Sequence, residues 1–178
     1  MGGAVRGSLI ATASLLVCAC GLLAQEPKVL EPELLGVVYY LHSGKGQLVP
    51  LERQAARQST AGGGFFFGQY KRRIKVDGAK SPVRFLQGQK LEFVVSGGEL
   101  QLYPLESKKD RREVVVSKAT VYFVTSRSRS ALAEKMLDVK RYGANVKVSP
   151  SEPLTPGEYG FYISGEVFCF AVDPPTSH

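Results

Sequence analysis

Two aromatic-rich segments, joined by a glycine-containing turn within residues 154–173, constrain the fold of this chain more than any other feature. Their sequence is LTPGEYGFYISGEVFCFAVD, in which bulky and small side chains alternate. This two-residue period is typical of β-strands that are buried on one face. Pro156 and Gly157 supply a turn before the first strand, and Gly165 supplies the turn between the strands. The stretch therefore predicts a β-hairpin.

The position of the turn predicts which side chains of this hairpin share a face. A two-residue turn that begins at Gly165 would place Ile163 opposite Phe168, because glycine suits the first central position of a type II′ turn. Opposed residues of an antiparallel pair lie on the same side of the sheet. The face that carries Tyr162 and Cys169 is the smaller and more polar one. We expect the other, bulky face to be buried in the core, with six residues together: Tyr159, Phe161, Ile163, Phe168, Phe170 and Val172.

Short strand patterns separated by turns recur along the rest of the chain. Residues 34–51 read as a hairpin around the turn SGKG, with Leu41 opposite Leu48, and Gly97 begins the turn of another. Strand patterns at this regular spacing indicate an antiparallel sandwich. We therefore expect one domain over residues 34–173, an all-β, immunoglobulin-like β-sandwich of roughly 8–9 strands.

Three stretches are less regular. Residues 52–58 fit a helical turn, and residues 59–64 (STAGGG) fit a flexible connection. Good helix formers near 130–137 predict a short helix there. Residues 137–142 could equally form a strand, with residues 145–148 as its hairpin partner.

The first residues have the layout of an export signal over residues 1–24. Arg6 provides a short basic start, an uncharged apolar run follows, and the first acidic residue is Glu26. We expect this segment to be helical and separate from the folded domain. Residues 25–33 contain two prolines and are predicted to be a tether, and residues 174–178 a disordered tail.

Three interpretations of the signal remain open. Cleavage after Ala24 would release the protein into the periplasm or the extracellular space. Residues 17–20 resemble a bacterial lipobox, which would make Cys20 the lipidated residue of a membrane-anchored lipoprotein. The segment could also stay as an uncleaved anchor. In each case the protein is exported, and contact with a membrane comes only through the signal or a lipid.

The chain has three cysteines, and two of them, Cys18 and Cys20, fall in the signal. Cys169 is then alone in the mature protein, so an intramolecular disulfide is excluded. We expect Cys169 to be a small buried apolar residue, with pairing between chains as the alternative.

Residue types that support catalysis are scarce. The chain has two histidines, His42 and His178, and no G-x-S-x-G sequence, so a hydrolase triad has little to draw on. Two histidines and one mature cysteine do not make a zinc site, and neither glycine-rich stretch has the spacing of a phosphate loop. We expect no enzyme activity, no cofactor and no metal site.

The net charge of +7 favours contact with anionic surfaces. Lys71, Arg73 and Lys75 alternate along a predicted strand, KRRIKV, and would lie on one face. They form either a binding surface for an anionic partner or an ordinary solvent-exposed strand face. Tyr162 is a second binding candidate, because sugars stack on aromatic rings. The basic residues are scattered rather than concentrated, so we expect an anionic envelope polymer or another protein as partner, and not nucleic acid.

Some segments resemble recurrent pieces of uncharacterised bacterial exported proteins with an immunoglobulin-like β-sandwich. They are GVVYYLHSGKGQLVPLE (36–52), GAKSPVRF (78–85), PGEYGFY (156–162) and VFCFAVD (167–173). The resemblance implies export and the fold, and it implies no activity. The resulting expectation is a non-catalytic, envelope-associated binding or structural module. A carbohydrate-binding accessory domain is the first alternative, and a hydrolase the second.

Overall fold

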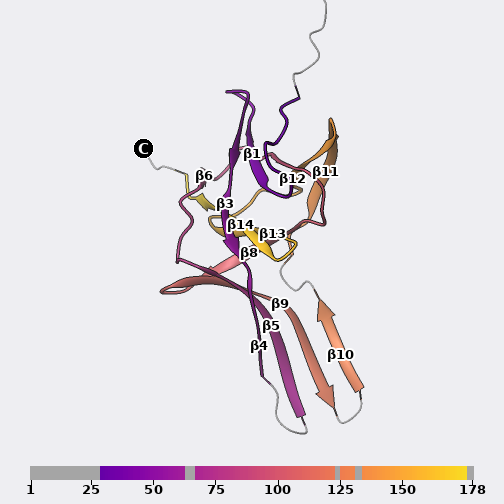
Figure 1. The fold of residues 1–178 in the computed structure, drawn as a ribbon. Coiled ribbons are helices and arrows are strands. Elements are labelled where there is room, and N and C mark those ends of the chain that lie inside the picture. Colours follow the sequence, from indigo (N-terminus) through magenta and orange to yellow (C-terminus); the bar gives the residue numbers. More distant parts are fainter. Residues whose placement is uncertain (1–28, 63–66, 123–124, 131–133, 176–178) are drawn as a thin grey trace, which may run out of the picture.

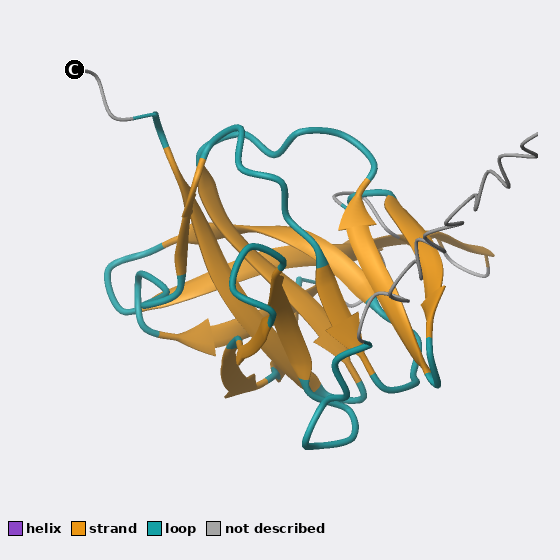
Figure 2. Ribbon diagram, turned by 90° about the horizontal axis from the view of Figure 1, so that it is seen from above, coloured by secondary structure: helices purple, strands orange, loops and turns teal. Residues whose placement is uncertain are grey.

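The computed structural model describes residues 29–62, 67–122, 125–130 and 134–175, and these form strands, turns and loops without a helix (Figures 1 and 2). The smaller of two sheets has five strands in the order β11-β12-β7-β1-β2, and all neighbours are antiparallel. Its strands are β1 (Val38–His42), β2 (Gln47–Pro50), β7 (Phe93–Val95), β11 (Leu137–Tyr142) and β12 (Asn145–Pro150).

The larger sheet has nine strands, of which seven follow the order β3-β14-β13-β8-β9-β5-β4. Two further strands are added to it: β10 pairs with β9, and β6 pairs with β14 in parallel. Its strands are β3 (Glu52–Ala55), β4 (Arg57–Ala61), β5 (Phe67–Asp77), β6 (Arg84–Leu86), β8 (Gln101–Ser107), β9 (Arg111–Tyr122), β10 (Thr125–Ser130), β13 (Gly157–Ile163) and β14 (Glu166–Asp173).

The larger sheet closes on itself. β3 and β4 stand at opposite ends of the strand order, yet only Ala56 separates them along the chain. The Ala56 amide donates to the carbonyl of Gly165 over 3.0 Å, and Gln58 Nε2 donates to the Tyr162 hydroxyl over 2.9 Å. We call this closed arrangement the rolled sheet.

The rolled sheet separates two hydrophobic cores. The sandwich core lies between the smaller sheet and the rolled sheet, and Phe93, Phe161, Phe168 and Phe170 form its fully buried aromatic centre. The inner core lies on the other face of the same hairpin strands, enclosed by the roll. Its members are Ile74, Val76, Tyr103, Leu105, Val114, Val116, Val167 and Cys169.

The bulky face of the C-terminal hairpin is buried as expected, because all six of its predicted residues belong to the sandwich core. The expected pairing was wrong: Phe161 lies opposite Phe168, and Ile163 lies opposite Glu166. The turn is Ser164-Gly165, and both residues have positive φ, 48° and 89°. This is the requirement of a type I′ turn, which the sequence reading did not consider at a serine. The observed register differs from the expected one by two residues, so every pair changes while each side chain stays on its expected face.

The antiparallel all-β sandwich is confirmed, but it contains more strands than the eight or nine expected. One reason is that residues 52–61 form β3 and β4 instead of a helical turn followed by a flexible connection. The helix expected near 130–137 is also wrong for the described residues: Ser130 ends β10, Lys135 forms a β-bridge with Leu102, and Leu137 begins β11. The alternative hairpin is correct, with Tyr142 opposite Asn145.

The export signal and Cys20 lie outside the described residues. Near the start of the described residues, the Leu30 amide donates to the Tyr142 hydroxyl over 3.0 Å, and the Leu34 amide donates to the Tyr39 hydroxyl over 3.2 Å. The segment that leads into β1 is thus fastened to the smaller sheet. Within the described ranges there is no helix of a length and hydropathy that could span a bilayer.

Candidate functional site

Four strands extend from the body of the molecule as an arm made of β4, β5, β10 and the C-terminal part of β9 (Figure 1). β9 builds it by changing neighbours: near its start Glu113 pairs with Glu106 of β8, and from Ser117 onward it pairs with β10. β5 lies on its other side along its whole length. The arm is therefore a continuation of the rolled sheet.

Lys71, Arg73 and Lys75 lie on β5, the strand between β4 and β9. A β-bulge interrupts the β5–β9 pairing, because Arg72 pairs with Ser117 while Arg73 pairs with Val115. The extra residue belongs to β9, so the alternation along β5 is unbroken. The three basic side chains consequently share the outer face of the arm, and all are partly exposed. We call them the basic row.

Acidic residues balance the charge at only one end of the basic row. Lys75 lies between Arg57 of β4 and Glu113 of β9, and Arg57 forms an ion pair with Asp77. Burial of the Glu113 carboxyl opposes its ionisation, but a 3.1 Å hydrogen bond from Arg111 Nε and nearby positive charge keep its pKa below the ordinary value. Charges are therefore largely compensated where the arm joins the body.

Farther along the arm no such acids are present among the described residues. Arg73 lies opposite Ser59, and Lys71 lies opposite Ala61. The Arg73 Nε and Ser59 Oγ atoms are buried and have no hydrogen-bond partner in the described part of the chain. On the other side, the backbone register places Lys71 opposite Lys118, and Lys118 opposite Arg129. Basic positions thus continue across three neighbouring strands.

Tyr162 does not join the basic row. It lies on β13, where its ring packs against the inner core and its hydroxyl accepts the hydrogen bond from Gln58. The structure therefore brings together the three predicted basic residues and places the predicted aromatic residue on the enclosed face of the rolled sheet. Large apolar side chains that are exposed include no aromatic residue within the described ranges.

A buried charge cluster fastens the base of the arm, and the sequence reading missed it. The side chain of Arg112 is fully buried, and its Nη1 and Nη2 atoms donate to the two carboxylate oxygens of Glu52 over 3.0 Å each. Nη1 also lies 3.5 Å from Glu158 Oε2, and Nε and Nη2 donate to the carbonyls of Gly78 and Asp77 over 3.0 Å each. One side chain thereby connects β9, β3, β13 and the turn after β5.

Glu158 is the second acid of this cluster, and its side chain is 8% exposed. It accepts a 2.8 Å hydrogen bond from the Ser81 amide and faces Arg84 Nη1 at 3.3 Å. Arg84 also pairs with Asp173 at the end of β14. Every member of the cluster is engaged by other protein groups, so we assign it a structural role. The signal that could have revealed Arg112 is its period-two spacing with Val114 and Val116, which both face the inner core.

Cys169 lies opposite Glu52 in the register of β14 and β3 and is a free, buried thiol. Burial raises its pKa to about 12, against a smaller opposing effect of the Arg112 charge. A thiol in this state is a poor nucleophile at neutral pH. The interpretation of Cys169 as a small apolar core residue is confirmed.

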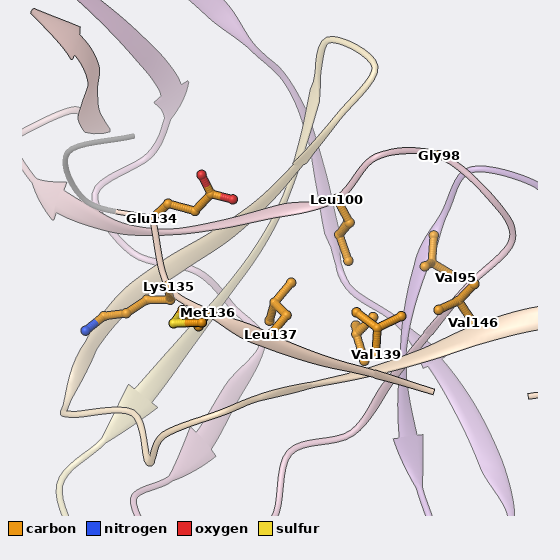
Figure 3. A pocket seen from close by; sticks show the side chains of 10 residues that line it. Val95, Gly98, Leu100, Glu134, Lys135, Met136, Leu137, Val139 and Val146 are labelled. Atoms are coloured by element: carbon orange, nitrogen blue, oxygen red, sulfur yellow. The ribbon is translucent and has the colours of Figure 1, made fainter. Parts of the chain in front are cut away.

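A groove opens where the two sheets separate, beside the outermost strand of the smaller sheet (Figure 3). It has a volume of about 550 Å³, and its floor and walls are mostly aliphatic. Glu134 and Lys135 stand at its rim. The aliphatic lining comes from Val95, Leu100, Leu137, Val139, Val146 and Val148.

Comparisons with protein-family models, with curated proteins and with solved structures found no match. The described part of the chain also contains no group of three His, Cys, Asp or Glu side chains that could hold a metal ion.

Proposed function

We propose that the protein is an exported, non-catalytic binding module that holds an anionic polymer of the cell envelope on the outer face of its arm. The observation that carries this proposal is the basic row. Lys71, Arg73 and Lys75 share one face, and none of them forms an ion pair with an acidic residue among the described residues.

Uncompensated positive charge on a sheet favours an anionic ligand, because like charges that lie opposite each other lower the stability of the sheet. Like charges at directly opposed positions of an antiparallel pair destabilise it, by amounts comparable to the roughly 0.2–1 kcal/mol that a favourable pair contributes. Lys71 and Lys118 are opposed in this way. An anionic ligand would remove the repulsion and offset this cost.

The spacing of the row fits a polymer better than a small anion. Alternate residues of a strand are separated by roughly 6.8 Å, so the row spans roughly 14 Å. A flexible chain that carries a carboxylate or phosphate at intervals of that size could engage all three side chains at once. Several weak contacts on one chain then add up to useful affinity.

The predicted export signal supports the same proposal, because a protein has to leave the cytoplasm to reach an envelope polymer. The basic start, the apolar run and the late first acid of residues 1–24 support a signal, and lipidation at Cys20 would hold the module at a membrane. Mass spectrometry of the protein recovered from its own cells would identify the first residue and any lipid. An intact N-terminus on protein found only in the cytoplasm would contradict export.

The binding test compares two triple variants with equal charge. One carries Lys71→Gln, Arg73→Gln and Lys75→Gln. The control carries Lys45→Gln, Lys80→Gln and Lys109→Gln, which are exposed and form no ion pair with a described residue. We expect the first variant to bind immobilised polyglutamate or polyphosphate at least roughly tenfold more weakly than the control, since each contact contributes up to about 1 kcal/mol. Equal binding by both variants would refute the basic row as the site.

A further inference from the structure

The outermost strand of the smaller sheet, β11, has a free edge: β12 pairs with one side, and no described strand pairs with the other. The opposite edge strand, β2, is only four residues long and ends at Pro50. Short strands and prolines protect an edge from pairing with another chain. β11 has six residues and no proline, so it lacks both of these protections.

The backbone of β11 is oriented for further pairing. The Ser151 amide donates to the Met136 carbonyl over 3.0 Å, so the amide and carbonyl groups of Met136 point toward β12. These directions alternate along an antiparallel strand. The groups of Asp138 and Lys140 therefore also point toward β12, whereas those of Val139 point to the free edge.

Apolar surface is concentrated at the same edge. Val139 is 64% exposed and Met136 is 81% exposed. Val139 lies opposite Val148, which is buried in the sandwich core, so Val139 belongs to the core-facing side of its sheet. Its side chain stands at the mouth of the groove (Figure 3). The exposed valine thus marks the place where the sandwich core is left open.

We propose that a second copy of this chain pairs antiparallel with β11, with Val139 opposite Val139 on a two-fold axis. A two-fold axis perpendicular to the sheet leaves each side chain on the same face in both copies. Because opposed residues must share a face, one residue of β11 has to lie opposite its own symmetry mate. Three central residues are available: Asp138, Val139 and Lys140. The charges decide among them.

An axis at Asp138 would place two carboxylates opposite each other, and an axis at Lys140 would place two ammonium groups opposite each other. An axis at Val139 places Asp138 of each copy opposite Lys140 of the other. Both residues are exposed and lie on the outer face of the sheet, so two complementary charge pairs result. Opposite charges at directly opposed positions stabilise a strand pair, and like charges destabilise it.

The same register satisfies the other features of the edge. The outward-pointing amide and carbonyl groups of Val139 bond to those of its symmetry mate. Leu137 and Val139 of the second copy continue the core-facing row across the axis and cover the mouth of the groove. The two smaller sheets become one continuous sheet, and Val139, which is 64% exposed in the single chain, is buried.

A charge exchange tests the register directly. We expect sedimentation velocity of the full chain to show a dimer, and Asp138→Lys or Lys140→Asp alone to weaken it by at least roughly tenfold, because both pairs become repulsive. The double variant D138K/K140D restores the complementary pairs and is expected to dimerise like the parent. A monomeric parent chain, single variants that dimerise like the parent, or a double variant that does not recover would each overturn the proposal.

A cysteine scan gives a second, independent measurement. Opposed residues of a hydrogen-bonded antiparallel pair have Cα atoms about 5.5 Å apart, which suits a disulfide. Val139→Cys is therefore expected to form a covalent dimer on oxidation, above the background of the parent chain. Arg141→Cys, whose copies would lie four residues out of register, is expected to remain at background. Equal cross-linking of both variants would contradict an axis at Val139.

Discussion

Arg112 and Glu52 form a two-point ion pair inside the rolled sheet, with 3.0 Å between each guanidinium Nη atom and its carboxylate oxygen. The pair joins β9, which continues into the arm, to β3, which closes the sheet. Glu158 adds a second carboxylate at 3.5 Å. The position of the basic row relative to the body therefore depends on a charge cluster whose central arginine, Arg112, is fully buried.

Arg112→Ala is expected to destabilise the protein by about 3–5 kcal/mol, because it leaves the Glu52 carboxylate without its counter-charge and leaves Glu158 with Arg84 alone. Chemical denaturation followed by circular dichroism measures the change in the free energy of unfolding. Arg111→Ala is the matched control. Arg111 is 40% exposed and pairs with Asp110 and Glu113, so its loss should cost much less than the loss of Arg112. Similar costs for both variants would argue against the anchoring role of Arg112.

Glu52 predicts how stability depends on pH. Burial opposes its ionisation, but the Arg112 and Gln54 hydrogen bonds outweigh burial and lower its pKa from 4.5. A lowered pKa in the folded state means that the ionised carboxylate stabilises the fold above pH 4.5, and that this contribution is lost as the pH falls through the folded-state pKa. The difference in unfolding free energy between the parent and Glu52→Gln should therefore shrink on acidification below pH 4.5. A constant difference would contradict the ion pair.

Gly160 tests the packing of the inner core. A Cβ atom there would lie 2.5 Å from Val167 Cγ1 and 3.1 Å from Leu105 Cδ1. Both neighbours are buried, so Gly160→Ala should overpack the roll and cost about 1–3 kcal/mol. At Gly157 the nearest atom is the Tyr159 ring at 3.8 Å, and Gly157→Ala should be tolerated. Differential scanning calorimetry of the two variants separates these outcomes, and an unchanged melting temperature for Gly160→Ala would rule out the tight approach.

Cys169 should resist alkylation in the folded protein at neutral pH, because burial raises its pKa to about 12 and excludes the reagent. Iodoacetamide treatment followed by peptide mass spectrometry reports on this residue separately from Cys18 and Cys20. Labelling is expected only after denaturant is added. Equally fast labelling with and without denaturant would show that the inner core is open.

Which side chains face the core could be read from the sequence, because strand alternation is a local property. The six bulky residues of the C-terminal hairpin and the shared face of Lys71, Arg73 and Lys75 both follow from a two-residue period. Their exact pairing could not, because it depended on whether Ser164 would accept a positive φ. A register shift of two residues keeps every side chain on its face, so the hydrophobic pattern of the sequence cannot reveal it.

The closure of the larger sheet could not be predicted from the sequence for a different reason. The residues of the closing segment that take part in these contacts are polar: Glu52 accepts from Arg112, Gln54 donates to Glu52, and Gln58 donates to Tyr162. A search for apolar alternation therefore passes over β3 and β4. Arg112 was missed likewise, because it is the last residue of the charged run SKKDRR (107–112), which resembles a solvated loop.

The salt dependence of polymer binding tests the central claim most directly. The logarithm of the binding constant of the full chain for polyphosphate should fall linearly with the logarithm of salt concentration, as bound counterions are released. Replacing Lys71, Arg73 and Lys75 by glutamine should reduce the steepness of that slope by roughly 2–3, about one for each lost contact. The Lys45, Lys80 and Lys109 control should keep the parental slope. A slope that is the same for both triple variants, or binding that does not respond to salt, would contradict an anion-binding arm.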